Sequence, residues 1–172
     1  MTIILGIDPG SRATGYGIIE VNGSQHKCLD YGVIRIAKST FAAQLYEIFS
    51  DLTKLLAQQM PHEVAIEQVF VQHNVSSALK LGQARGAAIT AVAQYQLPVF
   101  EYSTRQVKQA TVGYGGAIKQ QMQHMIKMLL KLKSVPPQDA ADALAIALCH
   151  AQMRKNLALR EKCSQQRSSS SK

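Results

Sequence analysis

Four carboxylates are the residues of this sequence whose types and positions point to chemistry. Asp8 and Glu67 each close a short apolar run that is typical of a buried strand. Asp139 and Asp142 stand three residues apart at the head of an alanine-rich stretch, so both would lie on one face of a helix. Acids gathered in a desolvated cleft repel one another and need cations. An all-oxygen site of this kind suits Mg²⁺ or Mn²⁺, and two such ions can support hydrolysis of a phosphodiester.

Each of these acids also has a simpler explanation. The Asp-Pro-Gly sequence that begins at Asp8 could form only a turn, since all three residue types favour turns. Acids in the first turn of a helix complement the helix dipole, which could account for Asp139 and Asp142. Glu101 is a further acid in a strand-like run, but it lies inside the run, and we expect it to have a local partner such as Arg105.

The elements that must position the acids predict an α/β fold. Three strand-like runs open the chain, and Asn22-Gly23 between the second and the third is typical of a hairpin. Apolar residues recur at intervals of three and four across residues 41–60 and predict an amphipathic helix. A strand that follows such a helix favours a parallel crossover, which would place Glu67 at the same sheet edge as Asp8.

The second half of the chain predicts a fifth strand and several helices. Residues 74–94 predict a helix rich in small residues, which suits either tight packing on the sheet or a dimer interface. Residues 97–102 predict the fifth strand, and residues 104–110 predict a short basic helix. The glycine cluster at residues 113–116 lacks the Gly-Lys-Ser/Thr ending of a phosphate-binding loop, so that kind of site is excluded.

Length and composition indicate one folded domain and a basic tail. The chain has 172 residues, 47% of them hydrophobic, and no apolar run long enough to span a membrane. Its three cysteines are widely spaced and match neither a zinc site nor a disulfide framework, so we expect free thiols in a reducing cytoplasm. We predict a folded domain over residues 1–153 and a disordered tail over residues 154–172.

Positive charge is concentrated in two stretches of the chain, whose net charge is +8. Residues 105–133 contain six basic and no acidic residues, and residues 154–172 contain six basic residues and one acid. Basic stretches beside a carboxylate site are typical of proteins that bind a polyanion, most often nucleic acid. The alternative is a solvated helix face followed by a solubilising tail.

Several motifs, taken in order, resemble those of the RuvC-type Holliday-junction resolvases of bacteria. They are Ile7-Asp8-Pro9-Gly10, Gly15-Tyr16-Gly17, Ile66-Glu67-Gln68-Val69-Phe70, Leu79-Lys80-Leu81-Gly82-Gln83-Ala84-Arg85-Gly86, Arg105-Gln106-Val107-Lys108 and Asp139-Ala140-Ala141-Asp142-Ala143-Leu144-Ala145. The resemblance covers residues 1–150. It implies a ribonuclease H-like fold, which is a five-stranded mixed sheet flanked by helices on both faces. It also implies a metal-dependent endodeoxyribonuclease that resolves four-way DNA junctions by paired symmetric nicks in homologous recombination and DNA repair.

The resemblance further implies roles for individual residues. The metal-binding catalytic acids would be Asp8, Glu67, Asp139 and Asp142, with Mg²⁺ or Mn²⁺ and two ions per site during catalysis. Contacts to DNA would come from Phe70, Lys80, Arg85, Arg105, Lys108 and Lys119. Phe70 would stack on an opened junction base, and packing in the core or a loop is the alternative. Family members act as homodimers, and the expected partners are junction DNA and the RuvA-RuvB branch-migration complex.

Three other classes of protein share parts of this pattern. Nothing in the residues themselves distinguishes a junction from another structured nucleic acid, so an RNase H-type nuclease with a different substrate is the alternative. An ATPase or sugar kinase of the actin-like superfamily needs two lobes, for which the chain is too short. A non-catalytic nucleic-acid module would have no need of all four acids.

Overall fold

The computed structural model describes residues 1–38, 40–69 and 75–169, with residues 155–169 described as backbone only. In this part of the chain, five strands form one sheet in the order β3-β2-β1-β4-β5. They are β1 (Thr2–Asp8), β2 (Ala13–Asn22), β3 (Gln25–Arg35), β4 (Glu63–Glu67) and β5 (Val99–Tyr102). The first three strands pair antiparallel, whereas β4 runs parallel to both β1 and β5. The predicted five-stranded mixed sheet is therefore confirmed, including the hairpin between β2 and β3.

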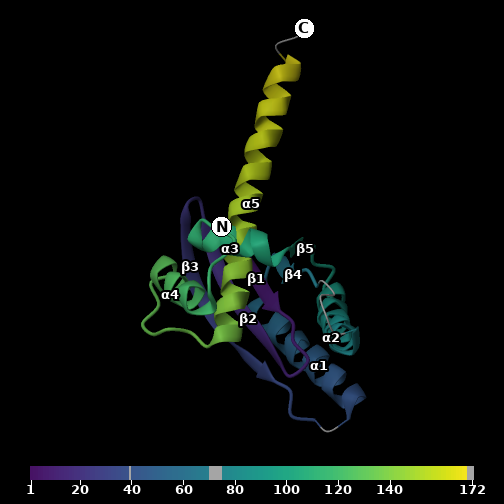
Figure 1. Ribbon diagram of the computed structural model, residues 1–172. Helices are drawn as coiled ribbons and strands as arrows, with labels where there is room; N and C mark the ends of the chain where they lie inside the picture. The colour runs from purple at the N-terminus through teal and green to yellow at the C-terminus, as the bar shows by residue number, and fades with distance from the viewer. Residues whose placement is uncertain (39, 70–74, 170–172) are drawn as a thin grey trace.

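Helices cover both faces of the sheet (Figure 1). One layer contains α1 (Phe41–Gln59) and α2 (Val75–Ala93), and the other contains α3 (Thr104–Val112), α4 (Lys119–Leu129) and α5 (Gln138–Ser169). Each layer shares a buried apolar cluster with one face of the sheet. Within the described ranges, no helix has the length and apolar character that crossing a membrane requires.

The two-residue period of the strands directs both strand-end acids toward α5. Buried side chains of β1 and β4 alternate between a cluster shared with α1 and α2 and a cluster shared with α5. Asp8 lies four residues after Ile4, and Glu67 lies two residues after Ala65, so each acid is on the same face of the sheet as that apolar residue. Ile4 and Ala65 both belong to the cluster that is shared with α5. The residues directly before the two acids are paired in the parallel register of β1 and β4. Asp8 and Glu67 therefore leave the sheet side by side on one face.

α5 lies unusually close to the sheet because the strands beneath it carry glycine. A Cβ atom at Gly15 would collide with the backbone oxygen of Asp139, and one at Gly6 would collide with the backbone oxygen of Ala143. Only glycine permits such an approach of strand and helix backbones. The same contact sets the position of the first turns of α5 over the end of β1.

α5 continues beyond the body of the protein (Figure 1). The helix runs to Ser169, so the predicted domain boundary at residue 153 falls inside it. The sequence predicts a disordered tail from residue 154, whereas the described backbone up to residue 169 is helical. Residues 155–162 are mostly leucine, alanine, lysine, arginine and glutamate, which favour helices, and they extend a helix that tertiary packing has already nucleated.

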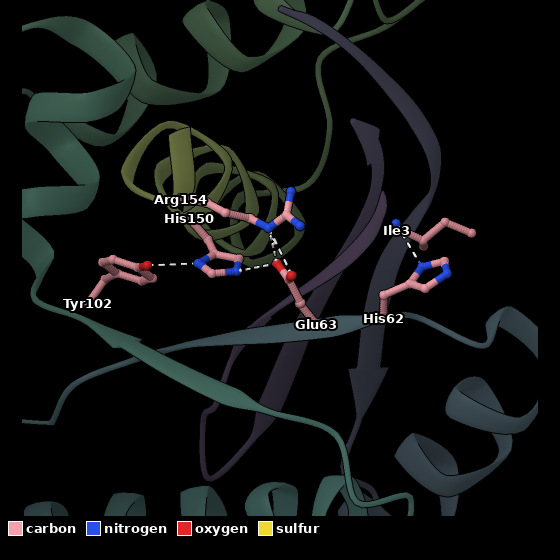
Figure 2. Close-up of polar contacts among 6 residues, drawn as sticks. All are labelled: Ile3, His62, Glu63, Tyr102, His150 and Arg154. Carbon is pink, nitrogen blue, oxygen red and sulfur yellow. Dashed lines mark hydrogen bonds and ion pairs between the residues drawn. The ribbon is translucent and has the colours of Figure 1, made fainter. Parts of the chain in front are cut away.

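Farther along α5, a polar network ties this helix to β4 and β5 (Figure 2). Nδ1 of His150 lies 2.7 Å from the hydroxyl oxygen of Tyr102, and Nε2 lies 2.9 Å from Oε2 of Glu63. Nε of Arg154 donates to Oε1 of Glu63 at 2.8 Å. The His150 ring is almost completely buried and stacks on Phe100.

The network is satisfied by a neutral imidazole. The Glu63 carboxylate can only accept, so Nε2–H of His150 donates to it and Nδ1 accepts from the Tyr102 hydroxyl. Burial is the main cause that lowers the pKa of His150, although the neighbouring carboxylate opposes it. The network therefore anchors α5 without placing a second positive charge beside Arg154.

We expect Gly15→Ala to destabilise the protein by about 1–3 kcal/mol, because the added methyl group must push α5 off the sheet. Urea unfolding followed by circular dichroism measures the change. Gly116→Ala is the matched control, since the nearest atom to its added Cβ would be 4.0 Å away, and a change below about 0.5 kcal/mol is expected. Equal unfolding free energies for the two variants would contradict the proposed close packing.

We expect Tyr102→Phe to lower the free energy of unfolding by about 1–3 kcal/mol, because it leaves the buried Nδ1 of His150 without a donor. Tyr46→Phe is the control, since Tyr46 is 69% exposed and its substitution should be nearly neutral. Thermal unfolding of both variants at neutral pH provides the comparison. Wild-type stability in Tyr102→Phe would show that the hydroxyl group does not support the network.

Candidate active site

Asp8 and Glu67 line one pocket at the carboxyl ends of β1 and β4. The pocket has a volume of about 290 Å³. Its walls consist of Asp8, Glu67, Thr104, Val107, Lys108, Lys119, Met122, Asp142 and Ile146. The prediction that the two strand-end acids share one sheet edge is confirmed. A larger hollow of about 540 Å³ beside the β2–β3 hairpin contains Glu20 as its only acid and offers no comparable chemistry.

α5 brings its own acids over these strands. Asp142 lines the pocket, and Asp139, one turn earlier, is close enough to raise the pKa of both Asp8 and Asp142. The helix starts directly after Pro137, whose backbone oxygen accepts the N–H of Ala141 at 2.8 Å. Proline at this position helps a helix to begin because it has no N–H to leave unpaired. The structure thus brings all four predicted acids within electrostatic reach of one another.

Burial and mutual repulsion perturb two of the carboxyl groups strongly. The pKa of Asp8 is raised from 3.8 to about 8, first by burial and then by the charges of Glu67, Asp142 and Asp139. The pKa of Asp142 is raised to about 6, again mainly by burial. In the protein without a bound cation, the Asp8 carboxyl group therefore holds its proton at neutral pH.

Two lysines supply positive charge in the same pocket. Lys108 comes from α3 and Lys119 is the first residue of α4. The charge of Lys119 lowers the pKa of both Asp8 and Asp142, and that of Lys108 lowers the pKa of Asp142. Neither lysine forms an ion pair with these acids among the described residues, so both charges are available to an anionic ligand.

Two other residues that were predicted to contact DNA lie away from the pocket. Lys80 on α2 and Arg105 on α3 are exposed but do not line the pocket. Phe70 lies outside the described residues. Of the five residues predicted to contact DNA that the structure describes, Lys108 and Lys119 are the two that line the pocket with the acids.

Arg85 lies behind Glu67 rather than at the surface. Its Nε donates to the backbone oxygen of Glu67 at 3.2 Å, and its Nη2 lies 2.7 Å from Oε2 of Glu101. The expectation that Glu101 pairs with Arg105 is therefore wrong. Glu101 directly precedes Tyr102 on β5, so their side chains point to opposite faces of the sheet. Tyr102 faces α5, and Glu101 therefore faces α2, the helix that carries Arg85.

Sequence reasoning missed Thr104. Its hydroxyl group donates to Oε1 of Glu67 at 2.6 Å, and the residue lines the pocket. The only local signal was the Ser103-x-x-Gln106 capping box, which marks the start of α3. That signal locates the start of α3 but does not show that Thr104 contacts Glu67 on β4.

The donor set of the pocket fits a hard divalent cation. Asp8, Glu67 and Asp142 offer only oxygen ligands, which Mg²⁺ and Mn²⁺ prefer, and the charge of Glu67 raises the pKa of both Asp8 and Asp142. Among the described residues, no three acid, histidine or cysteine side chains lie close enough to hold an ion as they stand. Mg²⁺ commonly needs only one or two direct carboxylates, together with water and substrate oxygens.

The sheet order and the helices on both faces define the ribonuclease H-like fold, and the acid cluster lies at the ends of its central strands. Comparisons with known proteins specify the family within this class. The family model described as crossover junction endodeoxyribonuclease RuvC matches residues 4–150. The chain belongs to this RuvC family.

Individual relatives agree along almost the whole chain. A crossover junction endodeoxyribonuclease RuvC of Pseudoalteromonas translucida is 57% identical over 157 residues, covering 91% of this chain and 90% of the relative. A protein of the same name in Coxiella burnetii is 59% identical over 149 residues, or 87% of each chain. The structure of Thermus thermophilus RuvC in complex with Holliday junction substrate superposes with a TM-score of 0.82 at 34% identity, covering 88% of this chain and 93% of that chain.

We expect Asp8→Asn to stabilise the metal-free protein near pH 8 by about 1–3 kcal/mol. Unfolded Asp8 ionises near 3.8, whereas folded Asp8 holds its proton up to about 8. The stability that the protonated Asp8 carboxyl group contributes is therefore fully present below the pKa of Asp8 in the unfolded chain. It is lost as the pH rises through the pKa of Asp8 in the folded protein. Asparagine cannot ionise, so the advantage of the variant should shrink toward pH 4. Urea unfolding in chelator across this pH range measures the effect.

The control for this prediction is Asp51→Asn, which removes an exposed acid paired with Lys54 on α1. Its effect should stay below about 0.5 kcal/mol and show little dependence on pH. If the Asp8→Asn variant were less stable than the wild type at high pH, that result would contradict the raised pKa of Asp8.

Proposed function

We propose that this chain is a metal-dependent endonuclease that resolves four-way DNA junctions by paired symmetric nicks in homologous recombination and DNA repair. The observation that carries the proposal is the convergence of acids from β1, β4 and α5 with two lysines in one pocket of a RuvC-family chain. The Thermus thermophilus relative is in complex with Holliday junction substrate, and we extend that substrate to this chain.

The acids Asp8, Glu67, Asp139 and Asp142 are the proposed catalytic ligands of Mg²⁺, with Mn²⁺ as a substitute and two ions present during catalysis. Bound ions of this kind activate a water molecule and stabilise the leaving oxygen of a phosphodiester. Asp8 must first release the proton that burial and repulsion retain. Metal affinity should therefore rise with pH up to about 8, the pKa of Asp8.

Basic residues are proposed to hold the DNA. Lys108 and Lys119 lie in the pocket with the acids, where their charges can bind the scissile phosphate. Lys80 and Arg105 are exposed and suit contacts with the DNA backbone farther from the cut. Arg85 is engaged by Glu67 and Glu101, so we assign it a supporting role instead. The stacking role of Phe70 rests on family membership alone.

The proposed enzyme is a homodimer, because resolving a two-fold symmetric junction requires two equivalent cuts on opposite strands. α2 is the candidate interface, since Val75 and Leu79 on it are 67% and 63% exposed. Apart from the adjoining residues and the nearby backbone of α2 itself, no described atom lies within 4 Å of a Cβ placed at Gly82 or Gly86, so this side of α2 leaves room for close packing. We further propose action in the cytoplasm with the RuvA-RuvB branch-migration complex as partner, on the basis of family membership.

A direct test is cleavage of a synthetic four-way junction, a linear duplex and an RNA–DNA hybrid, each with and without Mg²⁺. We expect symmetric nicks in the junction alone, and only when Mg²⁺ is present, because the acid cluster needs a cation to act. Labelled strands separated on a denaturing gel show both the position and the pairing of the cuts. Preferential cutting of the hybrid would retain the acid site but overturn the substrate.

Asp8→Asn provides the matched control for this experiment. It should bind the junction in a gel-shift assay while producing no nicks, since it changes the acid cluster and leaves both lysines in place. Cleavage by Asp8→Asn at the wild-type rate would remove Asp8 from the proposed site.

A further inference from the structure

The hydroxyl group of Thr104 joins the end of β4 to the start of α3. Its Oγ1 donates to Oε1 of Glu67 across 2.6 Å, although the two residues are 37 positions apart. Such a short distance is typical of a hydroxyl group bound to an ionised carboxylate. Both residues line the pocket that contains Asp8 and Asp142.

The bond to Glu67 is not a by-product of helix capping. The Ser103 side chain already accepts the N–H of Gln106, and Oε1 of Gln106 accepts the N–H of Ser103. The start of α3 is thus capped by the residues on either side of Thr104. Its hydroxyl group is left to act on the carboxylate instead.

Glu67 needs such a restraint more than the aspartates do. Its backbone oxygen accepts from Arg85, and the N–H of the next residue, Gln68, donates to the backbone oxygen of Tyr102. The main chain is therefore held, but the longer glutamate side chain retains an extra torsion that an aspartate lacks. Among the described residues, Thr104 is the one hydrogen-bond partner of the Glu67 carboxylate.

We propose that Thr104 is a positioning residue that holds the Glu67 carboxylate in the orientation that binds a divalent cation. The hydroxyl group fixes Oε1, so Oε2 would be the oxygen available to hold a cation. The same bond fixes the first turn of α3, which carries Lys108 one turn later on the same side of the helix. Thr104 thereby couples the position of the Glu67 carboxylate to that of the Lys108 side chain, which is proposed to bind phosphate. This inference rests on the proposed function.

The test compares Thr104→Val, which keeps the shape but removes the hydroxyl group, with Thr104→Ser, which keeps the hydroxyl group. Titration calorimetry with Mn²⁺ alone should show affinity reduced by about 10–100-fold in Thr104→Val and largely restored in Thr104→Ser. Thr111→Val is the matched control, because that hydroxyl group donates to the backbone oxygen of Val107 within α3 and no described residue of the pocket accepts from it. Its Mn²⁺ affinity should equal that of wild type.

Junction cleavage provides a second readout. Thr104→Val should need about 10–100-fold more Mg²⁺ for half-maximal rate, while its rate at saturating Mg²⁺ falls much less. Thermal unfolding in chelator shows whether the variants remain folded. Wild-type Mn²⁺ affinity in Thr104→Val, or an equal loss in Thr104→Ser, would overturn the positioning role alone. Absence of Mn²⁺ binding and junction cleavage in the wild-type protein would overturn the proposed function as well.

Discussion

The close packing of α5 on β1 and β2 is the constraint on which the rest of the structure depends. Glycine in both strands allows the helix backbone to approach more closely than any larger residue would permit. This approach brings Asp139 and Asp142 over the end of β1 and buries Asp8 deeply enough to raise its pKa to about 8. Farther along the same helix, the His150 network holds α5 against β4 and β5, so the helix is fastened at two places along its length.

The acid cluster is a destabilising feature that the surrounding fold must offset. Burial and repulsion disfavour the ionised carboxylates, and no described cation forms an ion pair with Asp8, Asp139 or Asp142. Two buried apolar clusters, one on each face of the sheet, provide the compensating stability. A divalent cation would remove the repulsion and a nearby DNA phosphate would engage the lysines, so ligand binding and charge balance are linked in this site.

Much of the fold could be predicted because the relevant signals are local. The helix predicted over residues 41–60 is observed as α1. It could be predicted because the spacing of its apolar residues is visible in a short stretch of sequence. The parallel crossover to β4 followed from a strand that comes directly after a helix of sufficient length, and it placed Glu67 beside Asp8. The predicted tail boundary at residue 153 lies inside α5, and the division into a domain and a tail stays a prediction.

The sequence by itself determined which acids close the strands, where the strands and the first helices lie, and that basic residues accompany the acids. Only the tertiary structure decided which groups meet across long separations. It directed Arg85 to Glu101 and to the backbone of Glu67, placed the Thr104 hydroxyl group on the Glu67 carboxylate, and buried Asp8 enough to change its protonation. The physical reason is that hydrogen bonding and burial depend on the distances between packed elements, whereas periodicity and turn chemistry depend on residues adjacent in the chain.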